Sequence, residues 1–397
     1  MFFEDKNRYN SSFKYFALLK DWIRKEKNKL IETKTGLSSF ICKIKFLDKF
    51  NQNPIIEPSD NDWESWQTFN PGVVNINNKI HIIYRAVGSD GVSRLGYAVS
   101  NDGFTIQNRL SYPVFEHKDF SSSGSYINYS LSSGSSLGGA EDPRPVYFKE
   151  DNRIYMTYTA LYNGLRVGFT SIAVSDFLNQ RWLWTKPIYL SPPNQVHKNW
   201  VLFPEKINGY YVFLTSITPE IVLHRRKTLF FRKNEYISSY YDTTLGRSWL
   251  SPRGWETRVR AVGPVPIKTK YGWLVFYHAM DNKDPDKYKV GAMLLDLNNP
   301  KNIIARSPVP VLEPDTLYEL NGNKPGIVYA SAAVVFEGIL IIYYGASDNY
   351  IAIAFANLES FLQDLLRYRK PKIESNKLLK KSKYAGNTIS TQPDFIT

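Results

Sequence analysis

Residues 79–86 read KIHIIYRA, a run of apolar and aromatic side chains that ends in a small residue. Four later segments share this pattern: RIYMTYTA at 153–160, GYYVFLTS at 209–216, GWLVFYHA at 272–279 and GILIIYYGA at 338–346. Short runs rich in β-branched and aromatic residues are typical of buried strands. The five segments therefore predict equivalent inner strands of a repeated unit.

The spacing of these segments predicts the architecture. Their starts lie 56 to 74 residues apart, and four of them are followed by a second run that alternates apolar and polar residues. A period of this length, with several strands per unit, fits the blades of a β-propeller with long loops. No convincing amphipathic helix separates the runs between residues 51 and 355. We therefore expect an all-β fold, a five-bladed β-propeller over residues 51–357, with a pocket at its axis.

The two ends of the chain have a different composition. Residues 12–30 carry apolar side chains at close to helical spacing. Residues 1–50 are thus expected to form a basic, partly helical N-terminal extension that packs on the propeller or on a second subunit. Residues 358–366 predict a short C-terminal helix, and the rest of the segment 358–397 is a polar, basic tail expected to be disordered.

Charge and composition exclude several classes of protein. The net charge of +13 resides mostly at the ends, since residues 1–50 and 367–397 each carry +6 and the region between them only +1. This distribution argues against a nucleic-acid-binding surface. A single cysteine, Cys42, excludes an internal disulfide framework and a cysteine-rich zinc site. No apolar run is long enough for a transmembrane helix, and the polar N-terminus predicts a cytoplasmic location.

The segment GGAEDPR at 138–144 carries the clearest chemical signal. Its glycines allow the backbone to approach a ligand closely, and Pro143 fixes a turn. Arg144 is expected to pair with one of the two adjacent carboxylates, which leaves the pKa of the other free to rise until it can donate a proton. The alternative is an acidic loop without a catalytic role.

The chain resembles glycoside hydrolase family 130, the β-mannoside phosphorylases and β-1,2-mannosidases. The resemblance rests on motifs that occur in the family's order across residues 53–357. They are FNPG at 69–72, YRA at 84–86, SRLG at 93–96, AEDPR at 140–144, TYTA at 157–160, LFPEK at 202–206, PIKT at 266–269, YH at 277–278, LLDL at 294–297 and YYGASD at 343–348. The family fold is a five-bladed β-propeller, which agrees with the repeat count.

The resemblance assigns roles by position. It implies that Asp142 is the acid that protonates the departing sugar oxygen. Six further residues are expected to contact the substrate: Asn70, Arg85, Glu141, Arg144, His278 and Asp348. For Arg85 an ion pair between blades is the alternative, for Asp348 the capping of a turn, and for His278 a place in the core.

The attacking group decides the reaction class. Phosphate requires a cluster of cations or donors, and Arg166, Lys198 and Arg94 stand where phosphorylases of the family place cations. Thr215 stands where these enzymes usually have a His-Arg-Pro run, so it offers a hydroxyl group without positive charge. An inverting hydrolase requires instead a carboxylate base about 6.5–9.5 Å from the acid. Glu220, near the altered stretch, is the candidate for that base.

The sequence therefore predicts an inverting enzyme that cleaves β-mannosides, first as a phosphorylase that releases mannose 1-phosphate. An inverting β-1,2-mannosidase, a β-mannosyltransferase and a mannoside-binding propeller without activity are the alternatives. Inorganic phosphate is expected as co-substrate of a phosphorylase, with no metal or organic cofactor, because the five histidines lack ligand spacing. The expected partners are a small oligosaccharide and, through the N-terminal extension, a second copy of the chain.

Overall fold

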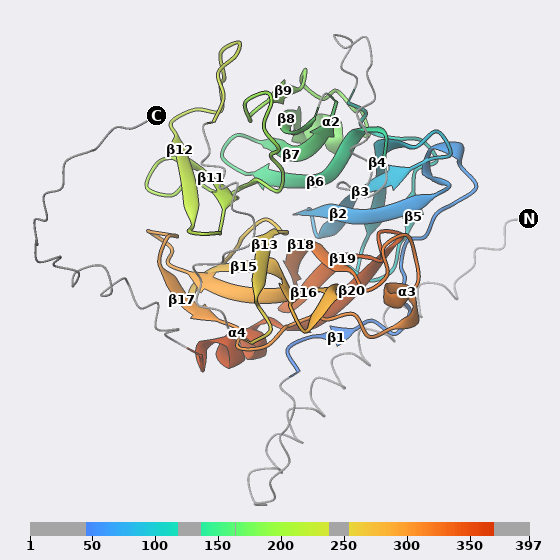
Figure 1. Ribbon diagram of the computed structural model, residues 1–397. Helices are drawn as coiled ribbons and strands as arrows, with labels where there is room; N and C mark the ends of the chain where they lie inside the picture. Colours follow the sequence, from blue (N-terminus) through green and yellow to red (C-terminus); the bar gives the residue numbers. More distant parts are fainter. Residues whose placement is uncertain (1–44, 118–135, 163, 238–253, 369–397) are drawn as a thin grey trace, which may run out of the picture.

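The computed structural model describes residues 45–117, 136–162, 164–237 and 254–368 (Figure 1). The predicted N-terminal helix at 12–30, its role in oligomer formation, Cys42 and the tail after residue 368 lie outside the described residues. The helices of the described part are short: η2 (Asp62–Glu64), α2 (Val174–Leu178), α3 (Leu317–Leu320) and α4 (Leu358–Leu366). The last coincides with the predicted C-terminal helix.

The strands of the described residues form five successive antiparallel units. The first contains β2 (Gln67–Ile76), β3 (Lys79–Val87), β4 (Val92–Ser100) and β5 (Asn108–Arg109). The second contains β6 (Gly138–Phe148), β7 (Arg153–Leu161), β8 (Leu165–Ala173) and β9 (Ile188–Tyr189). The third contains β10 (Val201–Leu202), β11 (Tyr211–Ser216) and β12 (Val222–Arg226). The fold is thus mostly β, as predicted.

The fourth unit contains β13 (Arg258–Val262), β14 (Ile267–Thr269), β15 (Gly272–Asp281), β16 (Asp284–Leu295) and β17 (Ile303–Arg306). The fifth contains β18 (Val328–Phe336), β19 (Ile339–Ala346) and β20 (Tyr350–Asn357), and β1 (Asp48–Lys49) joins it by pairing with β20. A short parallel pairing of β4 with β6 joins the first two units into one sheet. The five units therefore form four sheets in the described part of the chain.

The five repeated segments are β3, β7, β11, β15 and β19, and each is an interior strand that pairs with a neighbour on both sides. They occupy equivalent positions, as predicted, but they are not the innermost strands. The strands that precede them, β2, β6 and β18, pack against one another across the units. This difference matters because these preceding strands carry Asn70 and Asp142.

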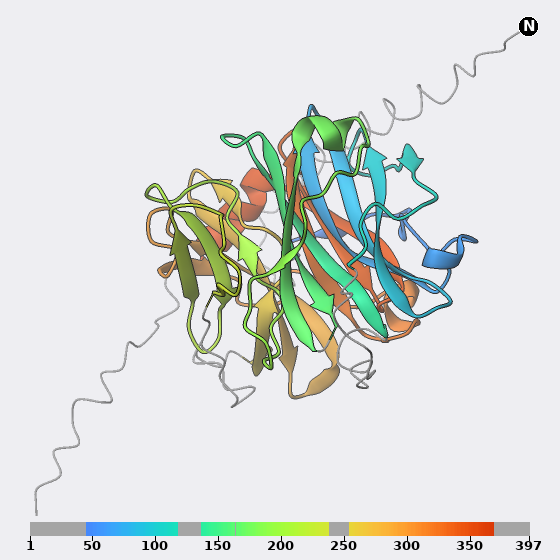
Figure 2. The ribbon, with the colours of Figure 1, turned by 90° about the horizontal axis from the view of Figure 1, so that it is seen from above.

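Side-chain packing joins each unit to the next. Five hydrophobic clusters lie between successive units, and one of them lies between the fifth unit and the first. In that cluster Ile82 of β3 packs with Ile341 of β19 and Ile353 of β20. Figure 2 shows these first and last strands, coloured blue and red, side by side. The ends of the repeated array therefore meet through apolar contacts.

A tyrosine in the repeated segment covers a glycine on the next strand in three units. Tyr84 lies opposite Gly96, and Tyr158 lies opposite Gly168. The third pair is Tyr277 and Gly291. A Cβ atom on Gly96 or Gly168 would lie 2.3 Å from a ring carbon of its tyrosine. The glycine is therefore required by the tyrosine ring that lies over it.

Two of these tyrosines, Tyr84 and Tyr277, and Tyr344 of the fifth unit place their hydroxyl groups in buried polar clusters. The Tyr84 hydroxyl donates to Glu64 at 2.7 Å and accepts from Arg109 at 3.0 Å. An equivalent cluster in the fourth unit comprises Tyr277, Glu256 and Arg306. The one in the fifth unit comprises Tyr344, Glu319 and Lys49. Each carboxylate has a cation beside it, as a buried charge requires.

Replacing Gly168 by alanine is expected to lower the free energy of unfolding by about 1–3 kcal/mol, because the new methyl group overlaps the Tyr158 ring. Urea denaturation measures this loss. Gly254→Ala is the control, since within the described residues no heavy atom beyond its chain neighbours lies within 4 Å of the Cβ position there. Equal stability of the two variants would show that the tyrosine ring moves aside freely.

Candidate active site

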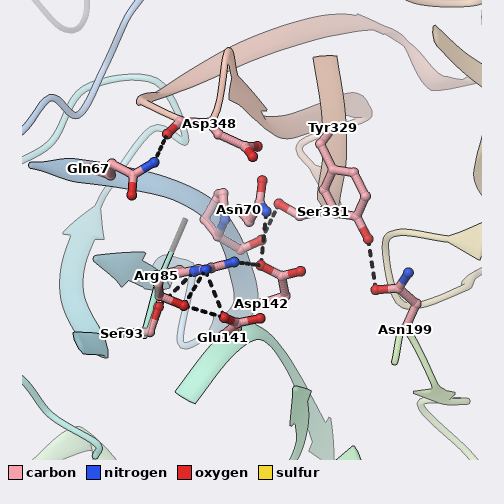
Figure 3. Close-up of polar contacts among 12 residues, drawn as sticks. Gln67, Asn70, Arg85, Ser93, Glu141, Asp142, Asn199, Tyr329, Ser331 and Asp348 are labelled. Atoms are coloured by element: carbon pink, nitrogen blue, oxygen red, sulfur yellow. Dashed lines mark hydrogen bonds and ion pairs between the residues drawn. The ribbon is translucent and has the colours of Figure 1, made fainter. Parts of the chain in front are cut away.

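Two turns bring the first and second units together, an Asn-Pro turn in β2 and an Asp-Pro turn in β6. Asn70 precedes Pro71 in β2 and Asp142 precedes Pro143 in β6, with φ angles of 45° and 49°. Each lies at a β-bulge, where the pairing register with the next strand shifts. Asn and Asp adopt this left-handed conformation more readily than most residues. As a result the Asn70 amide donates to Asp142 Oδ1 at 2.9 Å (Figure 3).

Arg85 of β3 holds both adjacent carboxylates. Its guanidinium donates to Glu141 Oε1 at 2.9 Å and lies 3.4 Å from Asp142 Oδ1. Its other hydrogen bonds go to the hydroxyl groups of Ser93 at 2.9 Å and Ser136 at 3.0 Å. The arginine is 2% exposed. Arg85 is therefore an ion-pair partner between the first two units and lies beside the expected acid.

Arg144 makes a different set of contacts from the one predicted. It donates to the backbone carbonyl of Asp142 at 2.8 Å and to the carbonyl of Gly263 at 3.0 Å. It also donates to Asn199 Oδ1 at 2.8 Å and to the Tyr329 hydroxyl at 3.0 Å. The bulge turns the carbonyl of Asp142, rather than its carboxylate, toward this guanidinium. Arg144 thus connects residues of the second, third, fourth and fifth units.

The electrostatics of Asp142 differ from the expectation of a raised pKa. Burial alone would raise the pKa of this carboxyl group. The positive charges of Arg85, Arg144 and Lys198, together with the hydrogen bond from Asn70, outweigh burial and lower the pKa below its ordinary value. Asp142 is therefore ionised at neutral pH in the ligand-free chain.

Lys198 lies in the same electrostatic cluster. Burial lowers the pKa of its ammonium group, while the charges of Asp142 and Glu141 act in the opposite direction. Lys324 and Arg260 are close enough to lower the pKa of Lys198 further. Lys198 therefore lies within electrostatic range of the two carboxylates of the motif and of two further cations.

Asp348 joins this cluster from the fifth unit. Its carboxylate lies 3.1 Å from the Lys324 ammonium group, and its carbonyl accepts from the Gln67 amide at 2.7 Å. Its φ angle is 50°. The four residues expected around the sugar, Asn70, Arg85, Asp142 and Asp348, thus come from three different units.

His278 is fully buried between aromatic rings. Its ring stacks on Tyr329, with the centroids 4.0 Å apart and the planes 10° apart. Nδ1 lies 3.1 Å from the carbonyl of Ala261, which accepts only, so this nitrogen carries the hydrogen. Burial lowers the pKa of His278 to about 3, and the ring is neutral at physiological pH. Its contacts place it behind Tyr329.

The remaining candidates have their described contacts away from Asp142. Arg94 pairs with Asp90 and Glu116, at 2.6 and 3.2 Å. Arg166 donates to the Ser191 carbonyl at 2.6 Å and lies over a tyrosine ring. The Thr215 hydroxyl lies 3.5 Å from a backbone carbonyl of β12, and Glu220 is exposed on the loop between β11 and β12. Roles of these four in catalysis or phosphate binding stay predictions.

Sequence reasoning missed four residues of the site: Asn199, Tyr329, Lys324 and Arg260. Asn199 directly follows Lys198, so its neighbour was the only signal for it. Tyr329 and Arg260 lie in stretches outside the motifs that carry the family resemblance. Nothing in the sequence indicated that these stretches lie near the site of Asp142, because they belong to the fourth and fifth units and Asp142 to the second.

The described ranges contain no cluster of three or more His, Cys, Asp or Glu side chains arranged to hold a metal ion. Within the same ranges, no helix has both the length and the apolar character needed to cross a membrane.

Comparison with known proteins matches most of the chain. A model of glycoside hydrolase family 130, described as beta-1,4-mannooligosaccharide phosphorylase, matches residues 41–367. A 1,2-beta-oligomannan phosphorylase from Thermoanaerobacter sp. (strain X514) is 33% identical over 321 residues, which cover 79% of this chain and 98% of that protein. A beta-1,2-mannobiose phosphorylase from the same strain is 32% identical over 330 residues, with the same coverage.

A solved structure shares the fold. A glycosyl hydrolase from Bacteroides ovatus superposes with a TM-score of 0.61 at 23% identity, covering 79% of this chain and 94% of that chain.

Replacing Asp142 by asparagine is expected to make the free energy of unfolding less dependent on pH in the acid range. Because the folded pKa lies below the ordinary value of about 3.9, the ionised form stabilises the fold above that pH. This contribution is lost as the pH falls through the folded pKa. The free energy of unfolding, measured in urea across the acid range, should thus fall more steeply for the wild type. The exposed Asp60→Asn is the control, and identical slopes for wild type and Asp142→Asn would contradict a lowered pKa.

Proposed function

Because the chain belongs to glycoside hydrolase family 130, we propose that it cleaves β-mannosides by phosphorolysis and releases mannose 1-phosphate with inversion. The names of the two Thermoanaerobacter relatives support phosphorolysis and favour β-1,2-linked substrates. The β-1,4 linkage in the description of the family model is the competing choice. A cytoplasmic location remains a prediction.

We further propose that the five units are the blades of a five-bladed β-propeller. The apolar cluster between the fifth unit and the first supports this arrangement, because it makes the array of units circular. The site then lies where β2, β6 and β18 approach one another.

The observation that carries the proposed reaction is the group of cations beside Asp142. Lys198 acts electrostatically on Asp142, and Arg260 and Lys324 in turn act on Lys198. A phosphate ion loses its hydration when it enters a site, and only paired positive charge compensates for that loss. Water as the attacking group needs no such cluster. The cations therefore favour phosphorolysis over hydrolysis.

The proposed step is a single displacement. A phosphate oxygen attacks the anomeric carbon of the terminal mannose, the bond from that carbon to the departing sugar oxygen breaks, and a proton from Asp142 reaches that oxygen. Asn70, Arg85 and Asp348 offer the mixture of donors and acceptors that fixes several sugar hydroxyl groups. One displacement without an enzyme nucleophile inverts the anomeric configuration.

The lowered pKa of Asp142 sets a condition on this step. An ionised carboxylate has no proton to give, so the ligand-free site is not ready for catalysis. A phosphate ion beside Lys198 adds negative charge near Asp142 and offsets the cations that hold it ionised. Phosphate binding therefore raises the pKa of Asp142 and favours the protonated form. In this proposal phosphate both attacks and prepares the acid.

Cleavage of β-1,2-mannobiose is expected to require inorganic phosphate and to yield mannose 1-phosphate and mannose in equal amounts. Rates with and without phosphate, and product identification by NMR, test this expectation. A parallel assay with β-1,4-mannobiose tests the linkage. Equal rates without phosphate, with mannose as the sole product, would identify a hydrolase.

The Asp142→Asn variant is expected to lose about 10²–10⁴-fold in kcat, because an amide does not supply the proton that the departing oxygen needs. Asp60→Asn carries the same change on the exposed surface and should keep wild-type kcat. Near-normal kcat of a folded Asp142→Asn variant would remove Asp142 from the role of acid.

A further inference from the structure

The segment that carries Lys198 is fastened to the second unit on both sides. The backbone amide of His197 donates to the carbonyl of Leu165 at 2.9 Å. The carbonyl of Trp200 accepts from the Thr157 hydroxyl at 2.8 Å. These bonds fix the ends of residues 197–200 on β7 and β8, but they do not set the conformation between them.

The side chain of Asn199 fastens the middle of this segment to β6 of the second unit and to β18 of the fifth. Its Oδ1 accepts from Arg144 of β6 at 2.8 Å. It also accepts from the Tyr329 hydroxyl of β18 at 2.9 Å (Figure 3). A carbonyl oxygen has two lone pairs, and these two donors occupy both. The φ angle of Asn199 is 65°, so the residue turns the chain through the left-handed region next to Lys198.

We propose that Asn199 is a positioning residue that holds Lys198 beside Asp142 and Glu141. The side chain of a lysine has four rotatable bonds, and its ammonium group remains in a partly dehydrated place only if its backbone is fixed there. Asn199 supplies that restraint through two buried donors on β6 and β18. The proposal rests on the proposed function in one respect, namely that Lys198 acts on phosphate.

The test is the Asn199→Gly variant, because glycine adopts the left-handed conformation without strain and removes only the acceptor. Asn208→Gly is the matched control. Asn208 has a φ angle of 53°, and its amide donates at 3.0 Å to a carbonyl on the molecular surface, away from Asp142. The two variants thus share the backbone change and differ in the contact to Arg144 and Tyr329.

The first measurement is the apparent pKa of Lys198, from the pH dependence of its acetylation followed by mass spectrometry. We expect the pKa of Lys198 to rise toward the ordinary value of about 10.4 in Asn199→Gly, since the ammonium group regains water. It should stay at the wild-type value in Asn208→Gly. An unchanged pKa in folded Asn199→Gly would overturn the proposal, whatever reaction the enzyme catalyses.

The second measurement separates the two substrates. The KM for phosphate should rise about tenfold in Asn199→Gly, while the KM for the mannoside stays close to that of Asn208→Gly. If the pKa rises and the KM for phosphate does not, Lys198 is not a phosphate ligand and that part of the proposal fails. Phosphorolysis itself is judged separately, on the phosphate dependence of the wild type.

A second variant covers the case in which Asn199→Gly does not fold. Tyr329→Phe removes one of the two donors to Asn199 and keeps the ring stacked on His278. It should shift both the pKa of Lys198 and the KM for phosphate in the same directions, by less. Wild-type values for both in Tyr329→Phe would then overturn the proposal.

Discussion

One buried guanidinium, that of Arg144, determines how the parts of the site lie relative to one another. Its planar fork donates to residues of the second, third, fourth and fifth units. A buried cation is tolerated only when its donors are satisfied, so each of these acceptors must stay in place. The left-handed turn at Asp142 and the conformation of Asn199 both depend on this arrangement. Lysine, with a point charge, offers no equivalent geometry.

The repeated strands could be predicted because they leave a local signal, whereas the meeting of Asn70, Arg85 and Asp142 was expected from motifs matched to the family. The repeated runs have a period, and the asparagine- and aspartate-proline turns are recognisable motifs. The sign of the pKa shift at Asp142 was wrong, since it depends on distances to Arg85 and Lys198 that no local pattern specifies. The contact of Asn199 with Tyr329 joins residues 130 positions apart in stretches without periodicity. Arg85, and not Arg144, pairs with the carboxylates of the motif, because the bulge in β6 turns the carboxylate of Asp142 away from Arg144. Sequence spacing does not reveal such a bulge.

Overall charge gave no indication of the site. The region between the basic ends carries a net charge of only +1, yet within it Lys198, Arg260 and Lys324 gather beside Asp142, Glu141 and Asp348. Arg85 and Arg144 raise the number of cations named at the site to five, against these three carboxylates. An incoming anion changes this balance, so binding and acid strength are linked at this site.

The pairing of β1 with β20 has a consequence for folding during translation. Asp48 and Lys49 find their partners at Phe355 and Ala354, and the Asn53 side chain bonds both backbone groups of Ile353. About 300 residues must be translated before these contacts exist. Until then β1 has no partner strand, and the first unit exposes the apolar surface that the last unit covers in the complete fold. Transiently exposed apolar surface of this kind makes an incomplete chain prone to aggregation until the last unit has been translated.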